Sequence, residues 1–301
     1  MRDQADRLRQ IIDSKKIKQS INHVDLISDE NKKTAKVITV TSGKGGVGKT
    51  NVTVNLAISL SELGYKVVIL DADFGLANID VLFGMVPRYT LVDVIRNKRN
   101  ILQVLSDGPE NIKFLSGGSG VEELVKLDNV QLEQFANNIS LLDKICDIIL
   151  IDTGAGLSDS VLNFVMASDE ILLVTTPEPT SITDAYALIK MVANRDKSKI
   201  IKVIVNRAES IYEANDILNK LVMVTNKFLG LKIYPLGYIL QDDMVIKAVK
   251  MQQPFTLSFP KSNAARLIKE ISKRIVETKP NSTEISGAKG FINKLVGFFS
   301  S

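Results

Sequence analysis

The sequence predicts an α/β fold, a doubly wound and mainly parallel sheet flanked by helices. Short apolar runs rich in β-branched residues recur along the chain, as buried strands do. Segments of helical length separate these runs, which is what crossovers between parallel strands require. A glycine-rich loop follows the first run, and acids follow two others, at Asp71 and Asp152. Ligands bind at such strand ends in open α/β sheets.

Length and composition predict one large domain with extensions at both ends. The chain has 301 residues, 45% of them hydrophobic, which is enough to bury a sizeable core. No apolar run reaches the roughly eighteen residues of a membrane-spanning helix. The N-terminus carries acids and has no apolar centre, so we expect no secretory signal and a cytoplasmic location. Cys146 is the single cysteine, which excludes the paired ligands of an iron–sulfur cluster and predicts a small core residue.

The net charge of +4 is concentrated at the two ends. Residues 244–301 hold ten Lys or Arg against three Glu, and residues 1–36 hold nine Lys or Arg against six acids. These basic ends indicate either contacts with an anionic surface or partner, or solvated helix faces.

Residues 1–20 predict a short amphipathic helix, with Ala5, Leu8, Ile11 and Ile12 on one stripe at helical spacing. A polar linker over 21–36 separates it from the main domain, 37–276. A detached helix of this kind suits a groove on another protein, and the alternative is a frayed terminal helix.

The first strand, from Val37, opens into GKGGVGKT, which fits the phosphate-binding pattern G-x-x-x-x-G-K-[ST]. Glycines let successive N–H groups point at a phosphate, and the next helix adds its positive end. Lys49 is then expected on the β- and γ-phosphates, and the Thr50 hydroxyl on Mg²⁺. The predicted nucleotide contacts in this loop are Gly43, Lys44, Gly45, Gly46, Val47, Gly48, Lys49, Thr50 and Asn51.

Two later strands are expected to bring acids to this loop. The strand over 66–70 precedes Asp71 and Asp73, which would either serve the nucleotide or cap a turn. The strand over 148–151 ends in Asp152, the Walker B form, which would hold Mg²⁺ through water. The glycine-containing segment 153–156 after it is a candidate switch.

The rest of the main domain repeats the pattern. Strands are expected over 170–176, 201–205 and 232–236, with a loop over 237–242 and a last helix over 263–276.

The C-terminus predicts a tether over 277–289 and an amphipathic helix over 290–301. A membrane surface is the expected environment of its apolar face, because a helix this short is not stable alone in water. Packing back on the main domain, as a resting state, is the alternative. The apolar face consists of Phe291, Ile292, Leu295, Val296, Phe298 and Phe299.

The loop resembles the deviant Walker A motif of the MinD/ParA ATPases, because Lys44 is an extra lysine inside it. The resemblance implies a MinD-like P-loop NTPase fold, slow Mg²⁺-dependent ATP hydrolysis, and a homodimer closed over ATP in which Lys44 reaches the partner's phosphates. It also implies that Asp73 positions the attacking water and that Asp71 is an outer-shell contact of Mg²⁺.

The same resemblance assigns the adenine side. Asn206 matches the asparagine that reads the adenine edge. Asp242 is carried over although its loop departs from the family, which has proline where Leu240 stands. A guanine site would need Asn/Thr-Lys-x-Asp, and the nearest stretch, over 226–229, ends in leucine. ATP is therefore favoured over GTP.

The N-terminal motif DQAxxLR selects a branch of this family. Asp3, Gln4, Ala5, Leu8 and Arg9 match it, and it resembles the start of the FlhG (YlxH) flagellar-number regulators. The resemblance implies that this helix stimulates FlhF, a GTPase of the signal-recognition-particle type. Gln4 would orient water or stabilise charge there, Leu8 would anchor the helix and Arg9 would pair with acids. It further implies flagellar switch-complex proteins as partners and a peripheral place on the cytoplasmic face of the inner membrane.

Three alternatives differ in what they require. A ParA-like DNA-partitioning ATPase would bind DNA with strong salt dependence, whereas we expect no specific nucleic acid. A MinD-like division-site regulator lacks the DQAxxLR extension. A tyrosine kinase with this loop would carry a C-terminal tyrosine cluster, and the last tyrosine here is Tyr238.

Overall fold

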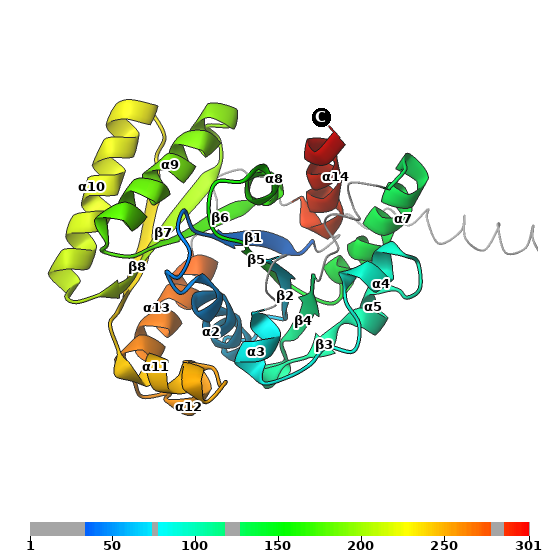
Figure 1. The fold of residues 1–301 in the computed structure, drawn as a ribbon, viewed down its shortest axis with the longest axis horizontal. Coiled ribbons are helices and arrows are strands. Elements are labelled where there is room, and N and C mark those ends of the chain that lie inside the picture. The colour runs from blue at the N-terminus through cyan, green and yellow to red at the C-terminus, as the bar shows by residue number, and fades with distance from the viewer. Residues whose placement is uncertain (1–33, 74–77, 118–126, 278–285, 301) are drawn as a thin grey trace, which may run out of the picture. The chain divides into compact units, whose positions relative to one another are not determined.

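The computed structural model describes residues 34–73, 78–117, 127–277 and 286–300. Its centre is an eight-stranded sheet in the order β3-β4-β2-β5-β1-β6-β7-β8, which confirms the predicted fold class (Figure 1). Neighbouring strands are parallel except β3, which runs antiparallel to β4 at one edge. The strands are β1 (Lys36–Thr41), β2 (Val67–Ala72), β3 (Ser106–Asp107), β4 (Lys113–Ser116), β5 (Ile148–Thr153), β6 (Glu170–Thr175), β7 (Ile200–Ala208) and β8 (Tyr234–Leu240).

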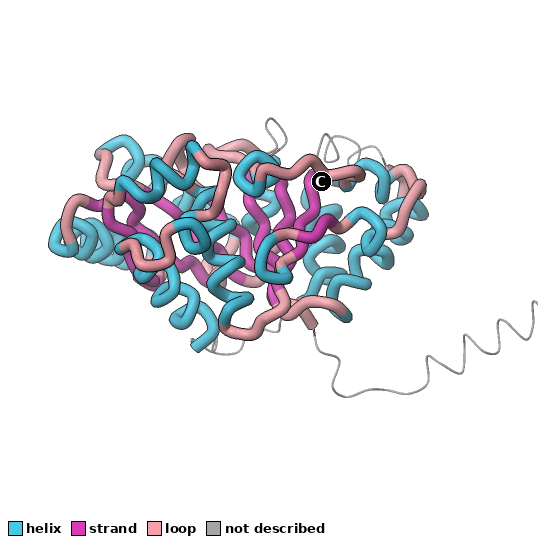
Figure 2. Tube along the Cα trace, turned by 90° about the horizontal axis from the view of Figure 1, so that it is seen from below, coloured by secondary structure: helices cyan, strands magenta, loops and turns pink. Residues whose placement is uncertain are grey.

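Helices cover both faces of the sheet, which Figure 2 shows between two helical layers. One layer holds α2 (Lys49–Glu62), α3 (Ile79–Phe83), α11 (Asp243–Lys250), α12 (Phe255–Ser258) and α13 (Asn263–Glu277). The other holds α7 (Asn129–Ile139), α8 (Asp159–Ala167), α9 (Pro179–Arg195), α10 (Ile211–Leu229) and α14 (Gly287–Ser300). Shorter pieces are α4 (Leu91–Ile95), α5 (Ile101–Val104), η1 (Pro109–Asn111) and η2 (Ser140–Lys144).

The strands alternate their side chains between these two layers, as the period of two requires. On β5, Ile148 and Leu150 pack in the core under α2 and α13. Ile149 and Ile151 pack in the core under α7 and α14. Both faces of the central strands are buried, which is why their sequences are continuously apolar.

Strand order sets the position of the functional site. β1 pairs with β5 on one side and β6 on the other. The later strands therefore lie on both sides of β1 in the sheet. Val40 is in register with Asp152, which is in turn in register with Asp71. The carboxyl ends of β1, β2 and β5 therefore meet at the point where the strand order reverses, the usual ligand site of this architecture.

Several strands differ from the sequence prediction: β3 and β4 were not expected, β7 covers 200–208 rather than 201–205, and β8 is shifted. β8 covers 234–240 rather than 232–236, so the stretch expected as an adenine-side loop is largely strand. Its pairing with β7 shifts register twice, and it is the last strand of the sheet. An edge strand tolerates Gly237, the residue at which the predicted loop began.

α14 packs against the main domain, which is the alternative to the expected membrane environment of its apolar face. Phe291, Ile292 and Leu295 are buried in the core shared with α7, α8 and η2. Phe298 remains 38% exposed. The helix begins at Gly287, three residues earlier than predicted. The structure thus has the packed-back alternative.

Two acids fasten the start of α14 to the start of β1. The N–H groups of Ala35 and Ala288 both donate to Asp143 Oδ1, at 3.0 and 2.9 Å. Asp169 accepts from the N–H of Ser286 at 3.1 Å and from that of Val37 at 2.9 Å. These shared acceptors place the C-terminal helix beside the strand that leads to the glycine-rich loop.

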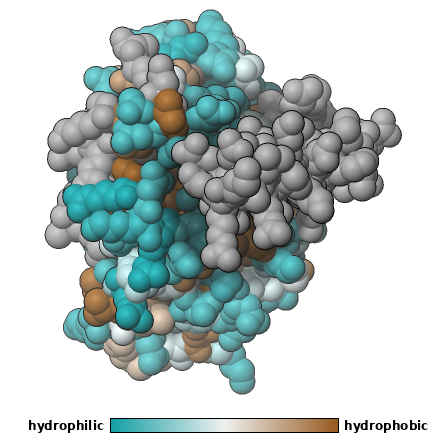
Figure 3. All heavy atoms as spheres, turned by 90° about the vertical axis from the view of Figure 1, so that its right-hand side faces the viewer, coloured by the Kyte–Doolittle hydropathy of each residue, from teal (hydrophilic) through white to brown (hydrophobic). Residues whose placement is uncertain are grey.

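The described helices include none that is both long and apolar enough to cross a membrane. The visible part of the face that carries α4, α5 and α7 is mostly hydrophilic, with apolar patches scattered over it (Figure 3).

Candidate functional site

The glycine-rich loop joins β1 to α2, and its shape explains two of its glycines. A Cβ on Gly43 would lie 2.4 Å from the backbone carbonyl of Asp184, and a Cβ on Gly48 would lie 2.5 Å from Asn206 Nδ2. Gly48 also has a φ of 89°, in the left-handed region that favours glycine. In the described residues no side chain caps α2, so its first N–H groups face the pocket and suit a phosphate.

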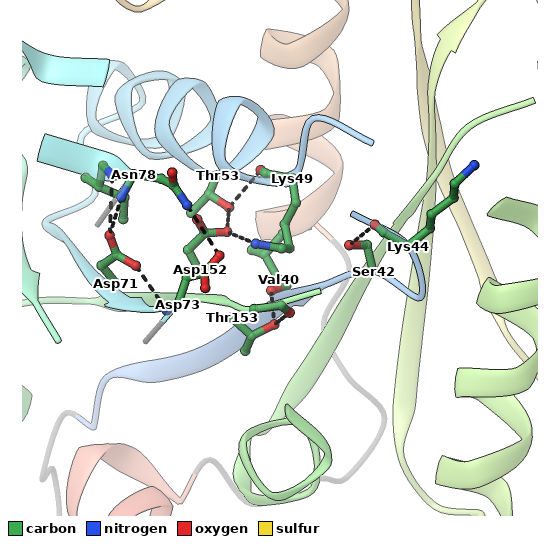
Figure 4. Close-up of polar contacts among 12 residues, drawn as sticks. Val40, Ser42, Lys44, Lys49, Thr53, Asp71, Asp73, Asn78, Asp152 and Thr153 are labelled. Atoms are coloured by element: carbon green, nitrogen blue, oxygen red, sulfur yellow. Dashed lines mark hydrogen bonds and ion pairs between the residues drawn. The ribbon is translucent and has the colours of Figure 1, made fainter. Parts of the chain in front are cut away.

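Lys49 and Asp152 form a buried ion pair at the base of this loop. Lys49 Nζ lies 3.1 Å from Asp152 Oδ1, and Thr53 Oγ1 donates to the same oxygen at 3.1 Å (Figure 4). The side chains of Lys49 and Asp152 are 7% and 0% exposed. Asp152 Oδ2 is buried and has no hydrogen-bond partner among the described residues. Burying an unpaired carboxylate oxygen is costly, so this atom fits a cation or a water bound to one.

A divalent cation fits the groups gathered here. Thr50 lines the pocket at the loop, and so does Lys49, whose ion-pair partner Asp152 carries the unpaired oxygen. Oxygen donors of this kind are what Mg²⁺ takes, usually together with nucleotide phosphates and water. The described residues hold no group of three or more His, Cys, Asp or Glu that could bind a metal by themselves. The site therefore suits a cation that arrives with a nucleotide.

Asp71 holds the turn after β2. Its Oδ1 accepts the N–H of Asp73 at 3.1 Å, and its Oδ2 accepts those of Asn78 and Ile79 at 3.1 and 3.3 Å. Burial, and secondly the charge of Asp152, raises the pKa of Asp71 from 3.8 to about 7 against the lowering effect of these N–H groups. The structure thus shows the capping alternative for Asp71, and its contact with Mg²⁺ remains a prediction.

This pKa gives a testable pH dependence. Between pH 3.8 and about 7 the folded state retains the Asp71 proton and the unfolded state does not, so the free energy of unfolding should fall as pH rises through this window. The slope should approach roughly 1.4 kcal/mol per pH unit. In urea unfolding of the nucleotide-free proteins at several pH values, the free energy of unfolding should fall more steeply with pH for the unsubstituted chain than for Asp71→Asn. Equal slopes in the two proteins would refute the raised pKa of Asp71.

Asp73 faces the same pocket as the loop. Asp73 Oδ2 accepts from Asn78 Nδ2 at 3.3 Å, and a Cβ on Gly154 would lie 3.6 Å from Asp73 Oδ1. The acid therefore sits over the segment predicted as a switch. That segment is tied to the loop by the N–H of Gly156, which donates to the carbonyl of Ser42 at 2.9 Å. The pocket has a volume of about 410 Å³.

A second pocket, of about 440 Å³, adjoins the loop on the side of α11. Asn206 lies at its edge and donates from Nδ2 to the carbonyl of Val47 at 2.8 Å. Asp242 is also on its wall, with Oδ1 accepting from the N–H of Met244 and Oδ2 from that of Ala264. Asp242 therefore caps α11 and anchors α13, a structural role that the sequence did not predict.

The sequence missed most of the walls of this second pocket. They are apolar and come from β8, α11 and the start of α12, far from the loop in the chain; they include Ile239, Leu240, Val245, Ile246, Val249 and Phe255. Arg207 lines both pockets and has a φ of 57°. The apolar residues carried no sequence signal, since they read as ordinary core.

Lys44 points away from the other site residues, toward the start of α9 (Figure 4). Its Nζ donates to Glu178 Oε2 at 2.7 Å and to Thr180 Oγ1 at 2.8 Å. The hydrogen bond and charge of Lys44 lower the pKa of Glu178. Glu178 is 60% exposed, and solvent screening makes such surface ion pairs weak. Lys44 can therefore exchange these contacts for others at little cost.

The remaining sequence expectations divide in two. Asp3, Gln4, Ala5, Leu8 and Arg9 lie outside the described residues. Cys146 is confirmed as a core residue: it is 4% exposed, and burial raises its pKa to about 12.

Comparisons with known proteins agree with this geometry. The ParA family model, described as "NUBPL iron-transfer P-loop NTPase", matches residues 33–276. The antiactivator FleN of Pseudomonas aeruginosa is 44% identical over 80% of this chain and 86% of its own. The flagellum site-determining protein YlxH of Helicobacter pylori is 32% identical over 99% of both chains. The structure of Pyrococcus horikoshii MinD with Mg-ADP has a TM-score of 0.64 at 27% identity, over 80% of this chain and 96% of that one.

Proposed function

Because the chain belongs to the ParA family of P-loop ATPases, in the FlhG-type branch that includes FleN and YlxH, we propose that it is an ATP-driven switch that regulates flagellar number or placement. The observation that carries the nucleotide chemistry is the buried Lys49–Asp152 pair under an uncapped helix start, with one carboxylate oxygen unpaired. The description of the family model names iron transfer. This chain has one cysteine, Cys146, and its thiol is buried.

Each residue of the site has a separate task in hydrolysis. Lys49 leaves Asp152 and places its ammonium group on the β- and γ-phosphates. Thr50 and Asp152 hold Mg²⁺, the latter through water, and bound Mg²⁺ neutralises charge on the phosphates. Asp73, which lies over the candidate switch segment 153–156, orients the attacking water. The apolar pocket beside Asn206 receives the adenine ring, and the amide of Asn206 reads its edge.

ATP is proposed to drive formation of a homodimer through Lys44. This lysine is held by exposed Glu178 and Thr180 and can exchange them for the phosphates of a second copy. The two protomers would then face each other across their nucleotides, and each hydrolysis cycle would end with separation.

The Asp73→Ala variant tests the assignment of the water-orienting acid. It should bind ATP, accumulate dimer and release almost no phosphate, because the phosphate contacts are intact and only the water has lost its acceptor. Light scattering with ATP and Mg²⁺, together with a phosphate-release assay, measures both properties. Asp243→Ala, at an exposed acid on α11, is the matched control and should behave as the unsubstituted chain does. Rapid turnover by Asp73→Ala would overturn the assignment, and monomers alone in both proteins would refute the dimer.

We further propose that the ATP dimer releases α14 to the cytoplasmic face of the inner membrane. Three buried side chains, Phe291, Ile292 and Leu295, then leave the core. This costs roughly 1.5–3 kcal/mol each, before burial in the membrane offsets part of the cost. A single helix would therefore bind a membrane weakly. Two copies in one dimer gain about 10²–10⁴ in avidity, so dimerisation would decide whether the protein is attached.

The N-terminal motif is proposed to stimulate a GTPase of the FlhF type. Gln4→Ala should leave the chain's own ATP hydrolysis unchanged and reduce its stimulation of the partner, since an amide that orients water acts only in the partner's site. Gln10→Ala, outside the motif on the same predicted helix, is the control. The measurement is GTP hydrolysis by the partner with each variant added. Equal stimulation by Gln4→Ala and Gln10→Ala would mean that the motif match is coincidental.

A pull-down with and without residues 1–20 distinguishes this branch from division-site and DNA-partitioning relatives. An FlhF-type GTPase recovered by the full chain and lost on truncation supports the flagellar assignment.

A further inference from the structure

A groove of about 940 Å³ lies between α8, the loop after α9 and the last turns of α14. It shares no lining residue with the two pockets at the glycine-rich loop. Its lining consists of Asp159, Ser160, Asn163, Met166, Arg195, Asp196, Lys199, Lys294, Phe298 and Phe299. Nothing in the nucleotide mechanism uses it.

The acids of the groove are already engaged. Arg195 Nη2 lies 3.3 Å from Asp159 Oδ1. Asp196 Oδ1 accepts from the N–H and the hydroxyl of Ser198, at 2.8 and 2.6 Å. Arg195 is thus balanced by Asp159, and Asp196 is held by its own turn.

Two lysines of the groove have unused donors. Lys199 Nζ donates to the carbonyl of Ser168 at 2.7 Å, which uses one of the three donors of its ammonium group. Lys294 makes no hydrogen bond or ion pair in the described part of the chain. Burial and the charge of Lys294 together lower the pKa of Lys199 to about 8, although Asp196 and Asp169 oppose the shift. The two ammonium groups therefore repel each other, and an anion between them would relieve that repulsion.

Part of the groove wall is apolar. It consists of Met166 and the partly exposed side chains of Phe298 and Phe299, which lie on the same helix as Lys294. Asn163 Nδ2 approaches the carbonyl of Phe298 at 3.5 Å and supports the last turn of α14 there. A molecule that fills this groove should accordingly have an anionic head and an apolar tail.

We propose that the groove binds one anionic phospholipid, with its phosphate between Lys199 and Lys294 and its acyl chains against Met166, Phe298 and Phe299. This goes beyond the proposed function, which assigns no ligand to this face.

The site has a consequence for α14, which does rest on the proposed function. Lys294 and both phenylalanines belong to that helix, so the groove exists only while α14 is docked. A ligand that binds one state stabilises it. Lipid in the groove should therefore oppose the release of α14.

Calorimetric titration of the nucleotide-free full chain with dihexanoylphosphatidylglycerol, below its micelle concentration, tests the site directly. Lys199→Gln and Lys294→Gln should each weaken binding about tenfold, the usual loss for one charge-assisted contact. Lys197→Gln and Lys289→Gln, at exposed lysines of the same loop and helix outside the groove, should leave the affinity unchanged. Absence of binding, or equal affinities in all four variants, would overturn the proposal.

Two further ligands test the two halves of the site. Inorganic phosphate should bind much more weakly than the lipid, because it lacks the tail, and dihexanoylphosphatidylcholine should also bind weakly, because its head has no net charge. Inorganic phosphate binding as tightly as the lipid would reduce the groove to an anion site and refute the role of the apolar wall. Acylation of the Lys199 amine, followed by mass spectrometry of its peptide, should be slowed by the lipid and not by the choline analogue.

Flotation on vesicles with ATP separates this proposal from the proposed function. The soluble lipid should reduce flotation of the unsubstituted chain and have no effect on Lys199→Gln. Complete absence of flotation would refute membrane attachment, while the titration would still decide whether the groove binds lipid.

Discussion

Lys49→Ala is expected to abolish ATP binding and hydrolysis and, in addition, to destabilise the nucleotide-free protein. The first effect follows from loss of the cation on the phosphates. The second follows from the ion pair: Asp152 is fully buried, and its oxygen 3.1 Å from Lys49 Nζ would lose its charged partner. Breaking a buried pair in this way costs about 3–5 kcal/mol.

A double variant separates the two effects. Lys49→Ala/Asp152→Asn removes the orphaned charge, so urea unfolding should recover most of the lost free energy while ATP binding, measured by calorimetry, stays absent. Asp152→Asn alone should retain Lys49 and bind nucleotide poorly in the presence of Mg²⁺, since a carboxylate oxygen has gone. If Lys49→Ala were as stable as the unsubstituted chain, the pair would have no structural role. If it bound ATP normally, the assignment of the loop would be wrong.

Phe164→Ala is expected to release α14 without ATP. Phe164 lies on α8, is 2% exposed, and its ring centroid is 6.1 Å from that of Phe291 on α14. Its truncation should cost about 3–5 kcal/mol, and part of that loss falls on helix docking. The change leaves the residues of α14 that are proposed to face a membrane intact. Any gain in vesicle binding therefore reports release of the helix and not a change in the helix itself.

Phe114→Ala is the matched control. Phe114 is 1% exposed, and its ring packs at a tilt against that of Phe83, with centroids 5.3 Å apart, on the other face of the sheet, away from α14. Both variants should lose similar stability. Phe164→Ala alone should float with vesicles in the absence of ATP and become sensitive to trypsin cleavage within α14, because a released helix unfolds. The same flotation and cleavage in both proteins would show general unfolding and contradict a docked resting state.

Sequence-based prediction was most accurate where neighbouring residues are enough to specify a structure. Val37 to Thr50 specifies its own strand, turn and helix start, because the apolar run, the glycines and the helix start follow one another directly in the chain and Gly48 can adopt a φ of 89°. The order of six of the eight strands followed for the same reason, whereas β3 and β4 were not predicted. β8 was ended too early because Gly237 is a turn residue by composition, and only its position at the sheet edge makes it acceptable in a strand.

Roles that depend on distant partners were predicted incompletely. Asp242 matched a nucleotide-binding position, yet both its oxygens accept backbone N–H groups. The apolar walls near Asn206 come from α11 and α12, and nothing in their sequence distinguishes them from core. The contact of Lys44 with Glu178 spans 134 positions, and neither residue predicts the other.

The sequence by itself determined the phosphate-binding loop, the alternation of strands and helices and the amphipathic character of the C-terminal segment, because each depends on residues close together in the chain. The tertiary structure decided that Lys49 is paired with Asp152, that α14 is docked on the core and that two lysines meet in a groove with two phenylalanines. Burial and charge pairing depend on which surfaces come together when the sheet closes. An amphipathic helix shows only that it has an apolar face, and the fold determines what covers it.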